Sequence, residues 1–235
     1  MKISEAIILA GGMGTRLRSA VPDLPKCMAP VNGKPFIAYV IEYLQSQGIE
    51  QFIFALGHQY EIIETYLQSQ LSHDSYQLSI ENEPLCTGGA IKLACPKATG
   101  KNILVVNGDT LYKADITKLS AFHSMCGADC TLSLKPMQDF NRYGSVELNK
   151  DYSIQSFKEK QYYKEGFINA GLYALNTLKF LHEDLPEKCS FEKDYLEKLY
   201  PQRRMYGVIQ DVYFLDIGIP EDYEKAQREI KSTIK

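Results

Sequence analysis

A glycine-rich segment near the start of the chain carries two cationic side chains in an arrangement that suits phosphate chemistry. The apolar run at residues 6–10 leads directly into residues 11–17, GGMGTRL, which include Arg16, and Lys26 follows Pro25. Glycines let backbone N–H groups approach phosphate oxygens, because no Cβ atom stands in the way. Arginine can bridge two phosphates with its planar fork, whereas lysine supplies a compact point charge. This segment therefore predicts a triphosphate-binding loop that acts on the phosphates.

Two carboxylates follow apolar runs elsewhere in the chain. Asp109 comes after a valine-rich run that ends in Asn107-Gly108, and Asp216 comes after Phe214-Leu215. Two such carboxylates brought together would suit a magnesium ion that also binds triphosphate oxygens. Aspartate beside glycine is also a common turn residue or helix cap. In a chain with the glycine segment, the metal interpretation is favoured, and Asp109 and Asp216 are the expected Mg²⁺ ligands.

The elements that must position these residues alternate along the first half of the chain. Apolar runs at 6–10, 52–56 and 102–106 have the pattern of buried strands, and residues 75–81 alternate like a strand. Helical spacing occurs at 36–44 and 60–67. Such alternation predicts parallel strands with right-handed crossovers and helices on both faces. Ligands collect at the carboxyl ends of strands in a sheet of this kind, where the glycine segment and Asp109 are expected.

The second half of the chain is richer in strand-like segments. These lie at residues 130–134, 143–148, 154–158 and 167–175, and helices are expected to start near Asp115, Asn176, Ser190 and Pro220. No linker, repeat or low-complexity tract divides the chain, so a single domain over residues 1–235 is expected, with a functional division near residue 115. The predicted fold is α/β: a mixed, mostly parallel, Rossmann-like sheet flanked by helices.

Composition excludes several other functions. The 235 residues carry a net charge of −3 and no basic run, so neither a nucleic acid nor a membrane surface is an expected partner. The sequence shows no apolar run long enough to span a membrane and no leader, so we expect a cytoplasmic protein. The six cysteines form no Cys-x-x-Cys pair, and the four histidines are dispersed. Neither set predicts a metal site or a nucleophile.

The apolar run, GGMGTRL and PKCMAPV together resemble the signature of the sugar-1-phosphate nucleotidyltransferases. These enzymes join a nucleoside triphosphate to a sugar 1-phosphate and release pyrophosphate. The segment matches neither G-x-x-x-x-G-K-[ST] nor the three-glycine dinucleotide fingerprint. The resemblance implies catalytic roles for Arg16, Lys26 and Asp109, with Mg²⁺ as cofactor. The nucleotide-binding residues that it implies are Leu9, Ala10, Gly11, Gly12, Gly14, Thr15, Arg16, Glu83, Thr87, Gly88 and Asp109.

Further segments resemble substrate-binding stretches of this family. Residues 83–90, EPLCTGGA, match the base-recognition stretch, except that Cys86 replaces a glycine. Residues 143–146 and 166–173 resemble sugar-pocket segments, and residues 159–160 resemble a Glu-Lys motif whose lysine contacts the sugar phosphate. Taken alone, the glycines here could be strand bulges, and Thr87 could cap the following helix. The sugar-phosphate-binding residues implied are Gly144, Glu159, Lys160, Asn169 and Gly171.

The motifs occur in the family order over residues 7–220, with the nucleotide expected in the first half and the sugar phosphate in the second. Overall resemblance favours GTP and D-glycero-α-D-manno-heptose 1-phosphate as substrates, for surface glycan assembly. Mannose 1-phosphate with GTP, or another hexose or muramate 1-phosphate with UTP or dTTP, stays open. A nucleotide-binding regulatory subunit without catalysis is a further alternative, against which the intact charged set argues. The apolar helix faces could also pack against a second copy, so a homo-oligomer stays open.

Overall fold

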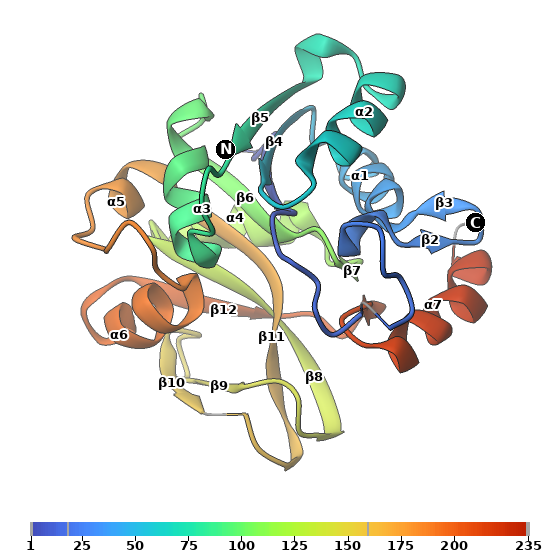
Figure 1. Cartoon of the computed structure of the whole chain (residues 1–235). Helices are drawn as coiled ribbons and strands as arrows, with labels where there is room; N and C mark the ends of the chain where they lie inside the picture. The colour runs from blue at the N-terminus through green and yellow to red at the C-terminus, as the bar shows by residue number, and fades with distance from the viewer. Residues whose placement is uncertain (1, 18, 159, 234–235) are drawn as a thin grey trace.

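The computed structural model describes residues 2–17, 19–158 and 160–233 and is built around one large sheet (Figure 1). Within these ranges the sheet has nine strands, in the order β10-β9-β11-β6-β1-β4-β5, with β8 paired to β11 and β12. Its strands are β1 (Glu5–Leu9), β4 (Gln51–Leu56), β5 (Tyr76–Ile80), β6 (Asn102–Asn107), β8 (Cys130–Phe140), β9 (Ser145–Leu148), β10 (Ile154–Lys158), β11 (Tyr163–Asn176) and β12 (Met205–Ile209).

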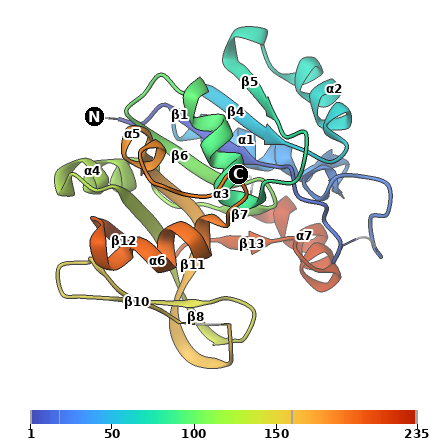
Figure 2. The ribbon, with the colours of Figure 1, turned by 60° about the vertical axis from the view of Figure 1, so that its left-hand side comes forward.

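Helices lie on both faces of this sheet (Figure 2). They are α1 (Phe36–Ser46), α2 (Tyr60–Gln70), α3 (Cys86–Ala94), α4 (Ile116–Cys126), α5 (Thr177–Leu181), a π-helical turn η4 (Phe191–Leu196), α6 (Glu197–Leu199) and α7 (Pro220–Thr233). Two small antiparallel pairs lie outside the large sheet, β2 (Pro30–Val31) with β3 (Lys34–Pro35) and β7 (Thr110–Tyr112) with β13 (Phe214–Asp216). Short 3-10 turns are η1 (Lys26–Met28), η2 (His73–Ser75), η3 (Cys95–Lys97) and η5 (Tyr200–Gln202). The predicted mixed, mostly parallel sheet flanked by helices is confirmed.

The central parallel strands β1, β4 and β6 are mostly apolar because both of their faces are buried, whereas the edge strand β5 is partly exposed and carries polar side chains. Strand β1 lies between β6 and β4, and Ile7 is in register with Ile53 and Val105. Successive side chains point to opposite faces of a strand. Ile8 accordingly packs in the core under α1, α2, α4 and α7, whereas Ile7 packs in the core under α3, α5 and η4. The carboxyl ends of β1, β4, β5 and β6 therefore meet along one edge of the sheet.

Strand β11 connects the two halves of the molecule. Residues 172–176 pair antiparallel with β6, and β8 pairs with residues 163–169 and 173–175 on the other side of β11. A register shift interrupts the pairing with β8 between Asn169 and Tyr173. Gly171 lies in this irregularity with φ +72, and a Cβ there would come within 2.4 Å of Asn107 Nδ2. A glycine is therefore required where β11 crosses the end of β6.

The expected elements are present, and the main omission is β12. Strand β12 runs parallel to β8 and includes Gly207, where a Cβ would lie 2.5 Å from Leu134 Cδ1. A glycine inside a short apolar run normally argues against a strand. Here the glycine is needed for close packing against β8, and it therefore conceals the strand in the sequence pattern. The helix starts expected at Asn176 and Ser190 are confirmed, because each side chain accepts a hydrogen bond from a backbone N–H three residues later.

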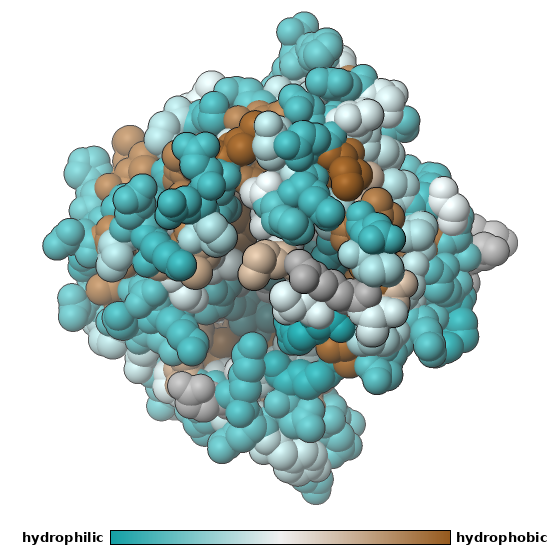
Figure 3. All heavy atoms as spheres, in the orientation of Figure 1, coloured by the Kyte–Doolittle hydropathy of each residue, from teal (hydrophilic) through white to brown (hydrophobic). Residues whose placement is uncertain are grey.

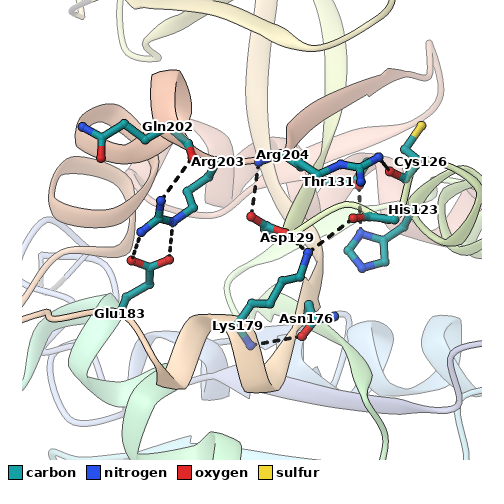
Figure 4. A network of polar contacts seen from close by, with 11 residues as sticks. His123, Cys126, Asp129, Thr131, Asn176, Lys179, Glu183, Gln202, Arg203 and Arg204 are labelled. Atoms are coloured by element: carbon teal, nitrogen blue, oxygen red, sulfur yellow. Dashed lines mark hydrogen bonds and ion pairs between the residues drawn. The ribbon is translucent and has the colours of Figure 1, made fainter.

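A polar network holds together elements of the second half (Figure 4). The buried Asp129 carboxylate, just before β8, is paired with Lys179 of α5 and accepts a hydrogen bond from Arg204 N at 3.2 Å. His123 lies nearby, with Nδ1 2.9 Å from Thr131 Oγ1. Burial lowers the pKa of His123 to about 4, so its ring is neutral at pH 7. This histidine supports the fold and lies outside the cavities described below.

Polar and charged residues cover much of the surface (Figure 3), as expected for a chain in which 23% of the residues are charged. The face seen in Figure 3 is mostly hydrophilic and is hollowed near its middle. Within the described ranges, no helix combines the length and apolar character needed to cross a bilayer.

Candidate active site

Three neighbouring cavities open at the carboxyl ends of the parallel strands. The loop cavity, of about 220 Å³, lies against residues 9–16 and Lys26. The α3 cavity, of about 480 Å³, extends from residues 9–15 to the start of α3. The β11 cavity, of about 450 Å³, extends from Arg16 and Lys26 to β11 and η4. Asp109 lines all three cavities, so reactants bound in them would meet beside this carboxylate.

Lys26 lies between the two carboxylates that were expected to bind metal. Its Nζ is 2.5 Å from Asp109 Oδ2 and 3.6 Å from Asp216 Oδ1. Burial and the nearby charge of Asp109 raise the pKa of Asp216, and the Lys26 ammonium opposes this shift. Gly218 N–H donates to Asp216 Oδ1 at 2.7 Å, and the Tyr143 hydroxyl donates to Oδ2 at 3.3 Å. The three charged groups thus form one compact, partly buried cluster.

The pairing of β7 with β13 brings these carboxylates together. Asp109 follows β6 directly after Gly108, whose N–H donates to Leu9 O at 2.9 Å. Asp216 is in register with Thr110, the residue after Asp109, and Ile217 N–H donates to Asp109 O at 3.1 Å. Two backbone pairings therefore set the separation of carboxylates that lie far apart in the sequence.

The glycine loop presents its backbone to this charged cluster. Gly12, Gly14 and Thr15 line the loop and α3 cavities, with Leu9 on the wall of both, Ala10 in the loop cavity and Gly11 in the α3 cavity. Gly14 has φ +57, and a Cβ there would lie 3.0 Å from Lys26 Cβ. The loop can therefore approach Lys26 only because this residue is glycine.

Arg16 completes the cationic side of the loop. Its exposed side chain lines both the loop and the β11 cavities. No ion pair to Arg16 is formed by the described residues, whereas Lys26 is held between two aspartates. The Arg16 guanidinium is therefore available to an anionic ligand that spans the two cavities.

Glu81 is a carboxylate of the α3 cavity that sequence reasoning missed. It follows β5, and its backbone N–H donates to Leu56 O at 2.8 Å. Its Oε2 accepts a hydrogen bond from Leu85 N–H at 2.8 Å, and Oε1 lies 3.0 Å from an ideal Cβ on Gly11. Burial raises the pKa of Glu81. Its place directly after a parallel strand, like that of Asp109, is the signal that could have found it.

Two residues expected to contact the nucleotide lie outside the three cavities. Glu83 is exposed and lines none of them. Gly88 is buried against the segment before η4: its N–H donates to Cys189 O at 2.8 Å, and a Cβ would lie 2.7 Å from Cys189 Sγ. Gly88 therefore allows α3 to pack closely and offers no free N–H to a ligand. The structure places Glu81 in the cavity position that the motif match gave to Glu83.

Thr87 lines the α3 cavity, but its hydroxyl points to η4. Oγ1 donates to Glu192 Oε2 at 2.7 Å and accepts a hydrogen bond from Phe191 N–H at 2.9 Å. The residue before α3 is Leu85, which makes no capping bond with its side chain. The alternative in which Thr87 caps α3 is therefore wrong, and Thr87 instead joins α3 to η4.

Cys86 has a left-handed backbone conformation, with φ +61, which favours the glycine of the family motif. Such a conformation costs a residue with a Cβ about 1–3 kcal/mol. Glycine avoids this strain, but its larger conformational entropy in the unfolded state offsets part of the gain in stability. Cys86→Gly should therefore raise the melting temperature by about 2–4 °C, corresponding to about 1 kcal/mol. Cys86→Ala retains the Cβ and is the matched control, expected to melt with the parent. Thermal unfolding followed by circular dichroism would decide, and equal gains from both variants would exclude backbone strain as the cause.

The β11 cavity contains most of the residues expected to bind a sugar phosphate. Gly144, Lys160, Asn169 and Gly171 line it, whereas Glu159 lies outside the described residues. Asn169 Nδ2 donates to the buried Tyr173 hydroxyl at 2.8 Å, and its Oδ1 accepts from Gly171 N–H at 3.2 Å. These bonds fix the orientation of the Asn169 amide, which has one further N–H to offer. Sequence reasoning missed five charged residues of this wall: Arg142, Lys158, Glu192, Lys193 and Glu197.

The cluster around Lys26 has the donor chemistry for a divalent cation that is shared with a substrate. Among the described residues no group of three or more histidine, cysteine or acidic side chains gathers as a metal site. Asp109 and Asp216 nevertheless each place an oxygen within 3.6 Å of one ammonium nitrogen. Mg²⁺ typically uses one or two carboxylates together with water and phosphate oxygens. These residues therefore fit a magnesium ion that binds together with a triphosphate.

Comparison with known proteins defines the class. The sequence model of the nucleotidyl transferase family matches residues 5–233, so the chain belongs to the nucleotidyl transferase family. A D-glycero-alpha-D-manno-heptose 1-phosphate guanylyltransferase of Aneurinibacillus thermoaerophilus is 51% identical over 230 residues, which cover 98% of this chain and 100% of that protein. An enzyme of the same name from Campylobacter jejuni is 44% identical over 220 residues, 93% of this chain and 96% of that protein.

The fold has a similar solved counterpart. HddC from Yersinia pseudotuberculosis, in a crystal structure complexed with GMP-PN, matches with a TM-score of 0.85 and 37% identity, covering 97% of this chain and 100% of that chain. The resemblance to nucleotidyltransferases is thereby confirmed for both the sequence family and the fold.

Proposed function

We propose that the protein transfers GMP from GTP to D-glycero-α-D-manno-heptose 1-phosphate and releases pyrophosphate. The observation that carries this proposal is the cluster of Lys26, Asp109 and Asp216, placed where the three cavities meet. The names of the two heptose relatives, which match nearly the whole chain, support the choice of substrates. A nucleotidyltransferase uses nucleoside triphosphates of the cytoplasm, so we propose that the protein acts there. We also propose that the chain forms a single domain.

The reaction needs charge control more than proton transfer. An ionised phosphate oxygen of the sugar phosphate attacks the α-phosphorus of GTP, and the bond to the β-phosphate bridging oxygen breaks, with its electron pair leaving on pyrophosphate. In-line attack increases negative charge on the phosphoryl and leaving-group oxygens. Lys26 and Arg16 would stabilise this charge, while the loop glycines hold the triphosphate. When bound by Asp109 and Asp216, Mg²⁺ would act as a Lewis acid on triphosphate oxygens.

The sugar phosphate would occupy the β11 cavity. Lys160 is on its wall and, as the family resemblance implies, would hold the phosphate near the charged cluster. The oriented amide of Asn169 would hydrogen-bond a sugar hydroxyl. Gly144 and Gly171 lie on the wall of this cavity, where a Cβ would come within 2.9 Å of Lys158 O and 2.4 Å of Asn107 Nδ2, so a side chain at either position would displace the wall beside the sugar.

The α3 cavity supports guanine as the base. Guanine offers two adjacent donors, N1–H and the 2-amino group, and a carboxylate only accepts hydrogen bonds. Glu81 is the carboxylate of this cavity whose Oε1 faces Gly11, while Leu85 N–H anchors Oε2. A fixed acceptor in this position would favour a base with two donors over uracil or thymine, which have one.

Glu81→Gln should lower kcat/KM for GTP by about 100-fold, because an amide replaces one acceptor oxygen with a donor. The preference for GTP over inosine triphosphate, which lacks the 2-amino group, should fall with it. Glu83→Gln is the matched control on the exposed carboxylate two residues away, expected within about twofold of the parent. Pyrophosphate release with both nucleotides measures all three enzymes. A large loss in Glu83→Gln with none in Glu81→Gln would instead support the motif-based assignment.

The function itself is tested by pyrophosphate release with Mg²⁺ over a grid of substrates. GTP, ATP, UTP, CTP and dTTP are each combined with heptose, mannose, glucose and muramate 1-phosphates. We expect the highest kcat/KM for GTP with the heptose phosphate. A signal that is stronger for another pair would retain the reaction and replace the substrates, whereas silence over the whole grid would contradict the proposal of an enzyme.

A further inference from the structure

Glu192 is a carboxylate of the β11 cavity that has no role in the chemistry described above. It lies in the first turn of η4, immediately after Ser190 and Phe191. Its Oε2 accepts two hydrogen bonds, from the Thr87 hydroxyl at 2.7 Å and from the Ser190 hydroxyl at 3.0 Å. No partner of Oε1 is found among the described residues, although Glu192 lines the cavity. One oxygen is therefore anchored and the other is left for a ligand.

The anchor is rigid because Thr87 is itself held in place. Its hydroxyl accepts a hydrogen bond from Phe191 N–H at 2.9 Å, which fixes the direction of its single proton toward Glu192. Thr87 belongs to α3, whereas Glu192 belongs to η4, more than 100 residues later in the chain. Two elements that pack against each other thus hold this carboxylate in one orientation.

The chemistry of the cavity indicates what the free oxygen would accept. A phosphate would be repelled by a carboxylate, and the wall already offers it Arg16, Lys160 and Lys193. Lys26 is close to Asp109 and Asp216, which are therefore committed to the charged cluster. A neutral hydroxyl can donate a hydrogen bond to the carboxylate oxygen and carries no negative charge that the carboxylate would repel. Sugar hydroxyls are the groups of this kind that the proposed acceptor would bring into the cavity.

We infer that Glu192 Oε1 accepts a hydrogen bond from a ring hydroxyl of the bound sugar 1-phosphate, which makes Glu192 a specificity-determining residue. Thr87 is its positioning residue, acting on the sugar from the helix that also borders the α3 cavity. This inference rests on the proposed function, because it takes a sugar 1-phosphate as the ligand of the β11 cavity.

The test compares Glu192→Gln with Glu187→Gln in the full-length protein. Glu187 is exposed and lines none of the three cavities, so its variant removes the same charge outside the proposed sugar site. We expect Glu192→Gln to raise KM for heptose 1-phosphate by about 10-fold or more while leaving KM for GTP within about twofold. Glu187→Gln should leave both values within about twofold. Thr87→Val should raise KM for the sugar phosphate less, and Thr87→Ser, which keeps the hydroxyl, should restore it.

Deoxy analogues of the sugar phosphate give a readout that a purely structural role would not change. Parent and Glu192→Gln enzymes are assayed with heptose 1-phosphates that lack the 2-, 3- or 4-hydroxyl. With one analogue, kcat/KM of the parent should fall by about the factor that Glu192→Gln loses with the full substrate. With the same analogue, kcat/KM of Glu192→Gln should not fall any further, because its contact to that hydroxyl is already lost. Equal losses by both enzymes with every analogue would overturn the inference. Glu192→Asp, which keeps the charge, provides the comparison if the glutamine variant melts early.

Failure of the inference is distinguishable from failure of the proposed function. If the parent turns over heptose 1-phosphate with GTP but Glu192→Gln behaves like Glu187→Gln, Glu192 does not contact the sugar and the function stands. If the parent is silent with heptose 1-phosphate and active with none of the other sugar phosphates, the proposed function fails, and the inference fails with it.

Discussion

Replacing Asp109 by asparagine should lower kcat/KM for pyrophosphate release by about 10³-fold or more, while the melting temperature stays within about 3 °C of the parent value. Asp109 lines all three cavities and contacts Lys26, so its charge is felt by each reactant and by the proposed Mg²⁺. Asparagine retains the shape of the side chain but is a weak ligand for Mg²⁺.

The small effect on stability has a physical reason. The Asp109 side chain is 32% exposed, and Lys26 keeps Asp216 as a partner at 3.6 Å, so neutralising Asp109 leaves no unpaired charge in the partly buried cluster. Neutralising Asp109 also removes the repulsion that raises the pKa of Asp216. Asp211→Asn is the matched control, since Asp211 pairs with Lys135 on the surface and should leave activity within about twofold. Pyrophosphate release by Asp109→Asn at the parent rate would remove Asp109 from the site.

Replacing Lys26 by methionine should lower kcat by about 10³-fold with a smaller change in KM for GTP. The ammonium lies between Asp109 and Asp216, the place from which it could follow charge as it moves to the leaving pyrophosphate. Lys26→Arg should restore less than about a tenth of the lost activity, because a planar fork does not fit a position built for a point charge.

The control for Lys26 is another lysine of the chain that is paired with a carboxylate. Lys34 pairs with Glu42 at 2.7 Å, and both side chains are about half exposed. Lys34→Met should leave kcat within about twofold, because neither Lys34 nor Glu42 lines a cavity and an exposed ion pair contributes little free energy. Rates are measured with saturating GTP and sugar phosphate. A Lys26→Met enzyme that keeps more than about a tenth of the parent kcat would show that Lys26 only assists binding.

The parts of this site that could be predicted have local signals. The glycine loop follows a buried strand within a few residues, and Asp109 directly follows another, so strand pattern and residue type together were sufficient. The direct contact of Lys26 with Asp109 could not be obtained in this way. It depends on the close approach of Gly14 to Lys26 and on the pairing of β7 with β13, neither of which leaves a periodic trace in the sequence.

Glu81 and Glu83 show the difference between matching a motif and following the backbone. The stretch at 83–90 attracts attention to Glu83 because its letters resemble a family motif. Glu81 is the residue at the end of the parallel strand β5, and the sheet directs that end into the cavity. The bond between Thr87 and Glu192 was still further from reach, since both are common polar residues, they lie far apart in the chain, and only the packing of α3 on η4 joins them.

Strand β11 has a consequence for dividing this molecule. Residues 172–176 of this strand form antiparallel hydrogen bonds with β6. Its earlier residues pair with β8 and β9, which belong to the second half of the chain. A fragment ending near residue 115 would leave β6 with a row of unsatisfied N–H and C=O groups beside apolar side chains. Open edges of this kind recruit other chains and aggregate. The first half of the chain is therefore ill suited to use as a transferable module, and a change of substrate specificity is better sought by substitutions within the intact sheet.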